Sequence, residues 1–118
     1  MIERLLPNRR SRIFLFFALA MTLLQLWAAW DPSAGEFAAG RLHLHVIAHF
    51  GSFALLALAW ACGLPGVPIV AIALAVAAFG FAQEAVEVPG HAHPFEWHEA
   101  LIDAAGALFG VLAARLLR

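Results

Sequence analysis

Charge is scarce in this chain, lysine is missing, and cysteine occurs once. Only 13% of the 118 residues are charged, whereas 64% are hydrophobic and the mean hydropathy is +0.85. A water-soluble domain could not cover so much apolar surface, so the composition indicates a membrane protein. The single cysteine, Cys62, excludes an internal disulfide, and no basic patch of the kind that binds nucleic acid is present.

Motifs of several common enzyme classes are also missing. No serine stands in a nucleophile elbow, and no glycine-rich phosphate loop occurs. His45 and His49 form an H-x-x-x-H pair, but the glutamate that would make it the HExxH motif of zinc proteases is absent. Cys62 lies in an apolar segment without an evident base, which favours packing over nucleophilic chemistry.

Charge-free runs predict four transmembrane helices. The run 13–30 is long enough, at ~1.5 Å per residue, to cross roughly the hydrocarbon core of a bilayer. The charge-free run 46–83 is divided by the prolines and glycines of GLPGVP at 63–68, which predicts two helices and a tight turn. We therefore expect an all-α fold, a four-helix transmembrane bundle that forms a single domain over 1–118. The expected spans are about 13–30, 46–64, 67–86 and 99–117.

The positions of the arginines bear on two questions: whether the first helix is kept or cleaved as an export signal, and on which side of the membrane the termini lie. Arginines before an apolar run also describe an export signal, but this run exceeds the usual signal length and the cleavage site is indistinct, so we expect retention. Only Arg41 lies in the loops opposite the termini, so both termini should be cytoplasmic, N-in and C-in. All histidines and every acidic residue except Glu3 then fall on the outer side. The arginines on the side of the termini are Arg4, Arg9, Arg10, Arg12, Arg115 and Arg118.

Polar or small residues form a stripe on three of the expected helices. Spacings of three and four residues place side chains on one helical face. The stripes are His45, His49 and Ser52 on the second helix; Gly80, Glu84 and Glu87 on the third; and Glu99, Asp103, Gly106 and Gly110 on the fourth. Glycines let helix backbones approach closely in lipid, so Gly80, Gly106 and Gly110 are expected packing contacts and the stripes should face one another.

The facing stripes predict a shared polar site. An ionisable group inside the hydrocarbon costs at least ~2.5 kcal/mol, so it needs partners or water. An outward-facing pocket is therefore expected to contain His49, Glu84, Glu99 and Asp103. Its expected rim is His45, Glu87, His91, His93 and His98. The alternative is that ionisable residues simply lie at helix ends in the headgroup region and form no site. We expect this of the loop residues His43, His91, Glu36 and Glu96.

Three segments also follow one another in a recognisable order: HFGSFALLAL from His49, QEAVEVPGH from Gln83 and FEWHEALIDAAGALFG from Phe95. They resemble motifs of the VanZ-like family, small bacterial membrane proteins named for a member linked to teicoplanin resistance. The family motifs are a histidine and an aromatic opening the second helix, Glu and Gln ending the third, a Pro-Gly-Arg loop, and Asp-x-x-x-Asn before a GxxxG helix. The resemblance covers 45–110. It implies a multi-pass protein of the bacterial inner membrane that affects the cell envelope or antibiotic response.

The chain departs from the family pattern where charge matters most. Glu99 and Asp103 stand where the family usually has Asp and Asn, and Glu87 stands for the usual Gln. Only His91 or His93 is near the position of the loop arginine. The missing arginine removes a fork suited to phosphate or carboxylate, and the added imidazoles and carboxylates favour a metal or proton site.

Three functions stay open at this point. The resemblance implies a binding or accessory protein that acts on a lipid-linked or glycopeptide-like envelope molecule. Alternatively, His45 and His49 with Glu84, Glu99 or Asp103 would hold a divalent metal cofactor in a membrane-embedded metalloprotein or hydrolase. A small oligomeric proton-coupled transporter is disfavoured, because no ionisable residue lies at the midplane of a span. The lipid bilayer is a partner in all three, and no catalytic residue is assigned.

Overall fold

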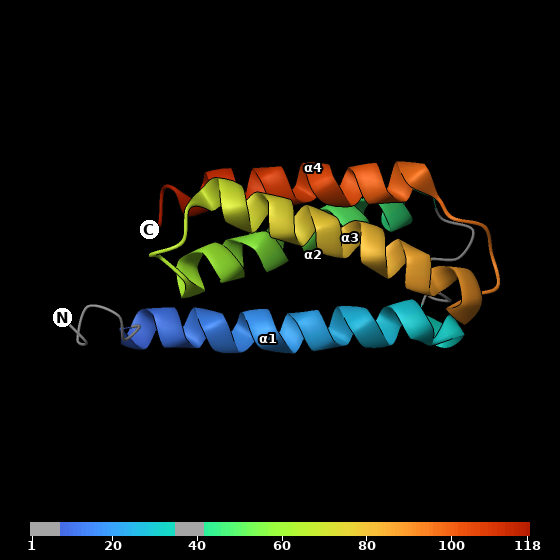
Figure 1. Ribbon diagram of the computed structural model, residues 1–118, viewed down its shortest axis with the longest axis horizontal. Helices are drawn as coiled ribbons and strands as arrows, with labels where there is room; N and C mark the ends of the chain where they lie inside the picture. Colours follow the sequence, from blue (N-terminus) through green and yellow to red (C-terminus); the bar gives the residue numbers. More distant parts are fainter. Residues whose placement is uncertain (1–7, 35–41) are drawn as a thin grey trace.

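The computed structural model is a bundle of four helices, and the described residues, 8–34 and 42–118, contain no strand (Figure 1). All four helices are long and apolar enough to cross a membrane. At ~1.5 Å per residue, a helix of 22 residues is about 33 Å long, close to the ~30 Å of a hydrocarbon core. The chain is therefore an all-α transmembrane bundle and a multi-pass membrane protein, as its charge-free runs predicted. The helices are α1 (Arg9–Trp30), α2 (Leu42–Gly63), α3 (Ile69–Gly90) and α4 (Trp97–Ala114).

Some residues used in the sequence argument fall outside the described part. These are Glu3, Arg4, Glu36, Arg41 and the side chain of His43.

The helix ends differ by a few residues from those expected from the sequence. α2 begins at Leu42, so the backbone of His43 is helical and not in a loop, and α3 continues through Pro89 to Gly90. α4 stops at Ala114, where the chain turns and Arg118 donates hydrogen bonds to the carbonyls of Pro65 and Val67 at the α2–α3 turn.

The helices are arranged so that α2 and α3 separate α1 from α4 (Figure 1). α4 packs against α2 and α3, while α1 packs against the other side of the same two helices. The start of α1, the α2–α3 turn and Arg118 lie at one end of the bundle. The opposite end holds the start of α2, the end of α3 and the loop that leads into α4. The ionisable halves of the three stripes therefore meet at that opposite end.

Two glycines set the distance between α2 and α4. A Cβ added at Gly106 would collide with the carbonyl oxygen of Phe50, and one added at Gly110 would collide with that of Ala54. The two backbones are therefore in direct contact. Van der Waals contact of this kind drives helix association in lipid, where the hydrophobic effect does not. Gly80 of α3 is also a packing contact, because a Cβ there would lie 3.0 Å from the Cβ of Asp103.

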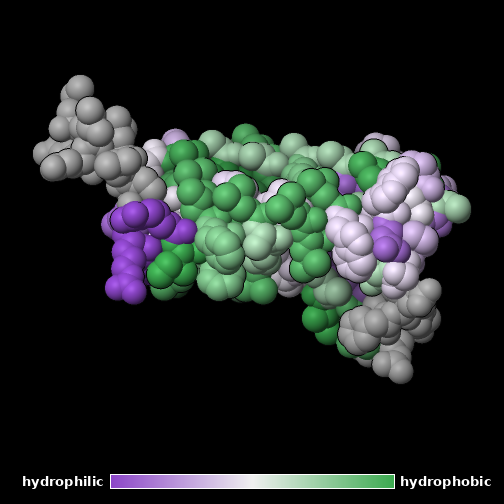
Figure 2. Space-filling model, turned by 90° about the horizontal axis from the view of Figure 1, so that it is seen from below, coloured by the Kyte–Doolittle hydropathy of each residue, from purple (hydrophilic) through white to green (hydrophobic). Residues whose placement is uncertain are grey.

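α1 packs against α2 and α3 through close glycine contacts at Gly63 and Gly90, and polar contacts add to this packing. The indole Nε1 of Trp60 donates to Thr22 Oγ1 at 3.1 Å. Gln83 Nε2 donates to the backbone oxygen and the side-chain Oε1 of Gln25, at 3.0 and 2.7 Å. The outer face of α1 is an exposed apolar belt, which Figure 2 shows between two more hydrophilic ends. In a bilayer this belt faces lipid.

Candidate functional site

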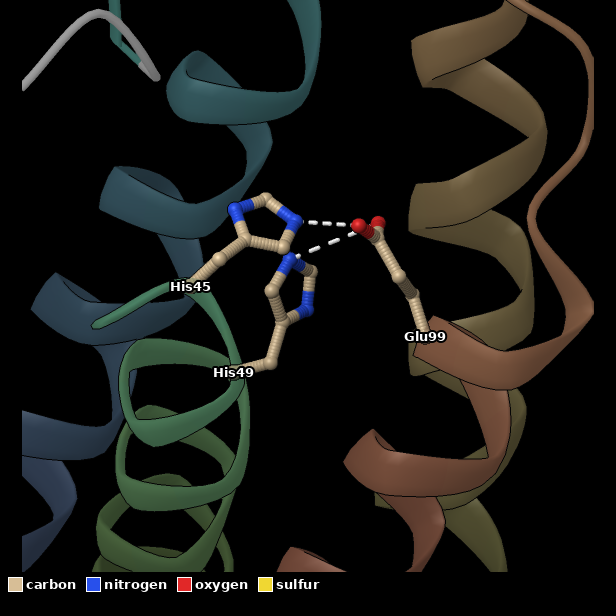
Figure 3. Close-up of side chains that lie close together, drawn as sticks. All are labelled: His45, His49 and Glu99. Atoms are coloured by element: carbon tan, nitrogen blue, oxygen red, sulfur yellow. Dashed lines mark hydrogen bonds and ion pairs between the residues drawn. The ribbon is translucent and has the colours of Figure 1, made fainter. Parts of the chain in front are cut away.

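A cluster of two histidines and two carboxylates joins α2 to α4 at the end where both helices begin. His49 Nδ1 lies 2.8 Å from Asp103 Oδ1, and His49 Nε2 lies 3.5 Å from Glu99 Oε2. His45 Nε2 contacts Glu99 Oε1. Figure 3 shows both imidazole rings pointing from α2 toward the Glu99 carboxylate on α4. We call these four residues, His45, His49, Glu99 and Asp103, the histidine-carboxylate cluster.

The geometry of the cluster follows from the two helices running in the same direction. His45 and Glu99 are 54 residues apart in sequence, and so are His49 and Asp103. A step of four residues on each helix therefore moves from one pair to the next, one turn deeper. The close backbone contact at Gly106 continues the same alignment below the cluster. The packing of small residues thus fixes which imidazole meets which carboxylate.

The cluster is less open than the outward-facing pocket expected from the sequence. Glu99 is 4% exposed and Asp103 is 1% exposed, because the side chains fill the space between the helices. Side-chain exposure rises from 14% at His49 to 37% at His45. Access from outside is therefore through His45, which was expected at the rim and instead contacts Glu99 directly.

Glu84 takes a different partner from the one expected. It is 1% exposed, and its Oε1 accepts a hydrogen bond from the backbone N–H of Glu96 at 3.0 Å. This bond ties the end of α3 to the residue that precedes α4. Glu87 Oε2 lies 3.9 Å from His93 Nε2, and ligand atoms of Glu84, Glu87 and His93 lie within 4.8 Å of one another. The α3 carboxylates thus form a second group beside the cluster.

The remaining rim residues separate from one another. His91 Nε2 lies 2.8 Å from the carbonyl oxygen of Ala28, so its N–H donates to α1 and not to the cluster. His98 is exposed and forms a third group with Glu96 and Glu99, whose ligand atoms also lie within 4.8 Å of one another. The expected site is therefore divided among α1, α3 and α4, with the tightest contacts between α2 and α4.

Glu96 is the site residue that the sequence argument assigned only to loop decoration. It is the N-cap residue of α4, just outside the span, and its backbone N–H holds Glu84. A hydrogen bond from the Glu99 side chain lowers the pKa of the Glu96 carboxyl, and partial burial works against that shift. No signal in the sequence indicated this role, because Glu is not one of the usual N-cap residues and its side chain makes no capping hydrogen bond.

Two hollows of the described part lie away from these groups. One cavity of about 350 Å³ lies between α1, α2 and α3 and is lined almost entirely by apolar side chains, with Thr22 and Trp60 among the lining residues. The other, of about 500 Å³, borders Arg9 and Arg12 at the opposite end of the bundle. Neither contains a member of the histidine-carboxylate cluster. Direct side-chain contact, rather than a preformed cavity, therefore defines the candidate site.

Comparisons of the chain with protein-family models, with curated proteins and with solved structures find no match. The chemistry of the site is accordingly argued from its own side chains. Two imidazoles and two carboxylates can hold a cation or share protons. Every arginine among the described residues lies at the other end of the bundle, so the described cluster offers no fixed positive charge to an anion.

Proposed function

We propose that this chain is a VanZ-like protein of the bacterial inner membrane, with both termini in the cytoplasm. Its histidine-carboxylate cluster then lies at the outer surface, where it binds a lipid-linked or glycopeptide-like envelope molecule. The observation that carries the proposal is the burial of Glu99 and Asp103 between α2 and α4 at that end. Intramembrane carboxylates are costly, and in membrane proteins they commonly mark a functional site.

A purely structural role for the cluster is the competing explanation. The bundle already has a means of joining α2 to α4, because Gly106 and Gly110 bring the backbones into contact along the apolar part of the interface. Buried ion pairs are often no more stabilising than apolar side chains of similar volume. Helix association alone therefore does not account for two histidines and two carboxylates at one end.

The charge of the cluster favours ligands with positive groups. Carboxylates and imidazoles accept hydrogen bonds from protonated amines, which peptide-bearing envelope molecules and glycopeptides can present. The half-exposed His45 is the side from which such a group would approach. A phosphate would be poorly received by the cluster alone, because Glu99 and Asp103 repel it when ionised.

The proposal is tested by expressing the intact chain in a teicoplanin-sensitive Gram-positive strain. We expect the inhibitory concentration of teicoplanin to rise above that of the empty vector. Asp103→Ala should return it to the vector value, while Leu101→Ala, on the lipid-exposed face of the same helix, should keep the wild-type value. Immunoblots of membranes must show equal amounts of all three proteins. An unchanged inhibitory concentration with the wild-type chain present in the membrane contradicts the proposal.

A further inference from the structure

We propose that the histidine-carboxylate cluster is a binding site for one divalent transition-metal ion, with His45 Nε2, His49 Nε2 and a Glu99 oxygen as ligands and Asp103 as a positioning residue. The proposal rests on the cluster being the functional centre, but metal binding can be measured without any envelope molecule. It commits to a mixed set of two nitrogen ligands and one oxygen ligand. Such sets suit Zn²⁺ and neighbouring first-row ions.

The first argument is the convergence of the ligand atoms. One atom each from His45, His49 and Glu99 lies within 4.8 Å of the others (Figure 3). In a tetrahedral zinc site, bonds of ~2.1 Å separate neighbouring ligand atoms by ~3.4 Å. The distance from His49 Nε2 to Glu99 Oε2 is 3.5 Å. This spacing is too long for a good hydrogen bond and fits two ligands of one ion.

The second argument is the proton position on His49. When both carboxyls are ionised they only accept hydrogen bonds, so the 2.8 Å contact with Asp103 Oδ1 then requires the proton on His49 Nδ1. In the neutral ring, Nε2 then carries the lone pair and faces Glu99 Oε2, which is another acceptor. A cation between them turns this unfavourable pair into two bonds. A carboxylate on the far nitrogen of a ligating histidine is the arrangement that orients imidazoles in metal sites.

The third argument is the charge balance in the bilayer. Glu99 and Asp103 are almost fully buried, and no arginine among the described residues lies at their end of the bundle. Two ionised carboxylates would repel each other in a medium of low dielectric constant. A divalent ion neutralises both charges at once. Protonation could also neutralise them, and this is the alternative that the experiment below separates from metal binding.

The two neighbouring groups are less suited to a transition metal. The group of Glu84, Glu87 and His93 has a single imidazole, and one Glu84 oxygen already accepts the Glu96 N–H. The group of Glu96, His98 and Glu99 also has one imidazole, on an exposed side chain, and it would compete for Glu99. Of the three groups found among the described residues, the histidine-carboxylate cluster is the one that combines two imidazoles with a positioning carboxylate.

The exposure of the ligands leaves one direction open. The His45 side chain is 37% exposed, whereas those of Glu99 and Asp103 are 5% and 1% exposed. Three protein ligands leave the fourth position of a tetrahedral ion free. We expect that position on the exposed side of His45, where the bound ion would offer a free coordination position to a ligand atom. An oxygen of an envelope molecule could then bind, although the carboxylates alone would repel an anion.

The test uses the full chain in detergent micelles, purified with a tag that contains no histidine and stripped with a chelator. Titration should show one Zn²⁺ or one Co²⁺ bound per chain, and bound Co²⁺ should give the intense visible bands of a tetrahedral ion. Excess Mg²⁺ should not displace it, because Mg²⁺ prefers oxygen ligands and octahedral geometry. A stripped, folded protein that binds neither ion overturns the proposal and supports shared protons instead.

Variants identify the ligands. His45→Ala, His49→Ala and Glu99→Ala should each lose the Co²⁺ bands, while His91→Ala, which removes a histidine bonded to α1, should keep the affinity and the bands. Asp103→Asn should weaken binding by ~10–100-fold but retain tetrahedral bands, as expected of a positioning residue. Because a variant could fail to fold, helical circular dichroism and thermal unfolding in chelator accompany each titration. Added Zn²⁺ should raise the unfolding temperature of the wild type and His91→Ala, raise that of Asp103→Asn less, and leave that of the three ligand variants unchanged.

The outcomes also separate this inference from the proposed function. Metal uptake with no change in teicoplanin sensitivity would leave the metal site standing and refute the envelope role. Teicoplanin protection by a wild-type chain that binds no metal would refute the metal site alone. Equal loss of Co²⁺ binding in His91→Ala and His45→Ala would show that the ion is not held by the histidine-carboxylate cluster.

Discussion

The two ends of the bundle carry ionisable groups in opposite ways. At the end with the start of α1, Arg9, Arg12 and Arg115 are exposed, and Figure 2 shows a hydrophilic surface there. At the other end Glu99 and Asp103 are buried between helices. Exposed charges are solvated and can orient a chain in the membrane without contacting one another. Buried charges require partners, so among the described residues it is the second end that has the composition of a site.

The helices α1 and α4 also differ in how they contact the rest of the bundle. α4 touches α2 along backbone contacts at Gly106 and Gly110, and its polar cluster continues that alignment. α1 presents a wide apolar face to lipid, and it contacts α2 and α3 at Gly63 and Gly90 and through hydrogen bonds such as Trp60 to Thr22. The α2–α4 pair therefore carries the site, and α1, whose span is 11% buried against 44% for α4, is the more peripheral helix.

The largest expected effect concerns which end faces outward. If the arginine end is cytoplasmic, a reporter fused after Arg118 and a reporter inserted near Ser33 should give opposite signals, because the two positions lie at opposite ends of the bundle. Paired alkaline phosphatase and fluorescent-protein fusions measure this as an all-or-none result. Phosphatase activity at the C-terminus would reverse the assignment of outer and inner ends.

The next effect is expected at the α2–α4 contact. Gly106→Leu forces a side chain into the Phe50 carbonyl, and overpacking of this kind costs about 1–3 kcal/mol or more. Ala105→Leu, the neighbouring exposed position of α4, should change the stability by less than about 0.5 kcal/mol. Thermal unfolding in detergent compares the two variants. Similar losses in both would show that α4 tolerates no added volume on either face and that the glycine contact is not special.

A smaller effect is expected from removing one ionisable side chain at each end. His49→Ala leaves Asp103 buried without its hydrogen-bond donor, which should cost about 1–3 kcal/mol in the absence of metal. Arg12→Gln changes an exposed side chain and should stay within about 0.5 kcal/mol of the wild type. Denaturant unfolding in mixed micelles, with chelator present, measures both. A larger loss of unfolding free energy in Arg12→Gln than in His49→Ala would contradict the contrast between exposed charges at one end and buried charges at the other.

The smallest effect is a pKa change at Asp31, an exposed acidic group beyond the end of α1. Hydrogen bonds from the Ser33 hydroxyl and backbone lower the Asp31 pKa below its ordinary value of 3.8. Because the folded pKa is lowered, any stabilisation is present above that ordinary value and is lost as the pH falls through the folded pKa. Ser33→Ala removes the largest cause and should raise the Asp31 pKa.

Asp31 and Asp103 are the only aspartates in the sequence, so ¹³C-labelled aspartate gives two carboxyl signals for an NMR titration. The Asp31 signal should shift its midpoint upward in Ser33→Ala, while the Asp103 signal should not change. An unchanged Asp31 midpoint would mean that the Ser33 hydroxyl bond is not formed in the micelle.

The sequence by itself determined the four spans, their turns and the faces on which polar residues fall. These features depend on local chemistry: the charge-free run 13–30 satisfies its backbone hydrogen bonds in a bilayer as a helix, and the two prolines and two glycines at 63–68 interrupt the next run. Spacings of three and four residues also place His45 with His49 and Glu99 with Asp103 on common faces. Helix boundaries were predicted less well, because capping contacts such as Arg118 at the α2–α3 turn decide them.

Only the tertiary structure decided which polar residues meet. The sequence grouped Glu84 with His49 and placed His91 at the rim, but Glu84 accepts the Glu96 N–H and His91 bonds to α1. The spacing of residues shows which side chains share a face of a helix. It does not show how the helix is rotated about its axis, or shifted along it, relative to the neighbouring helix. The rotation and the shift are set by backbone contact at Gly106 and Gly110 with residues of α2 more than fifty positions earlier. This contact aligns two parallel helices turn by turn, and the alignment turns separate histidines and carboxylates into one cluster.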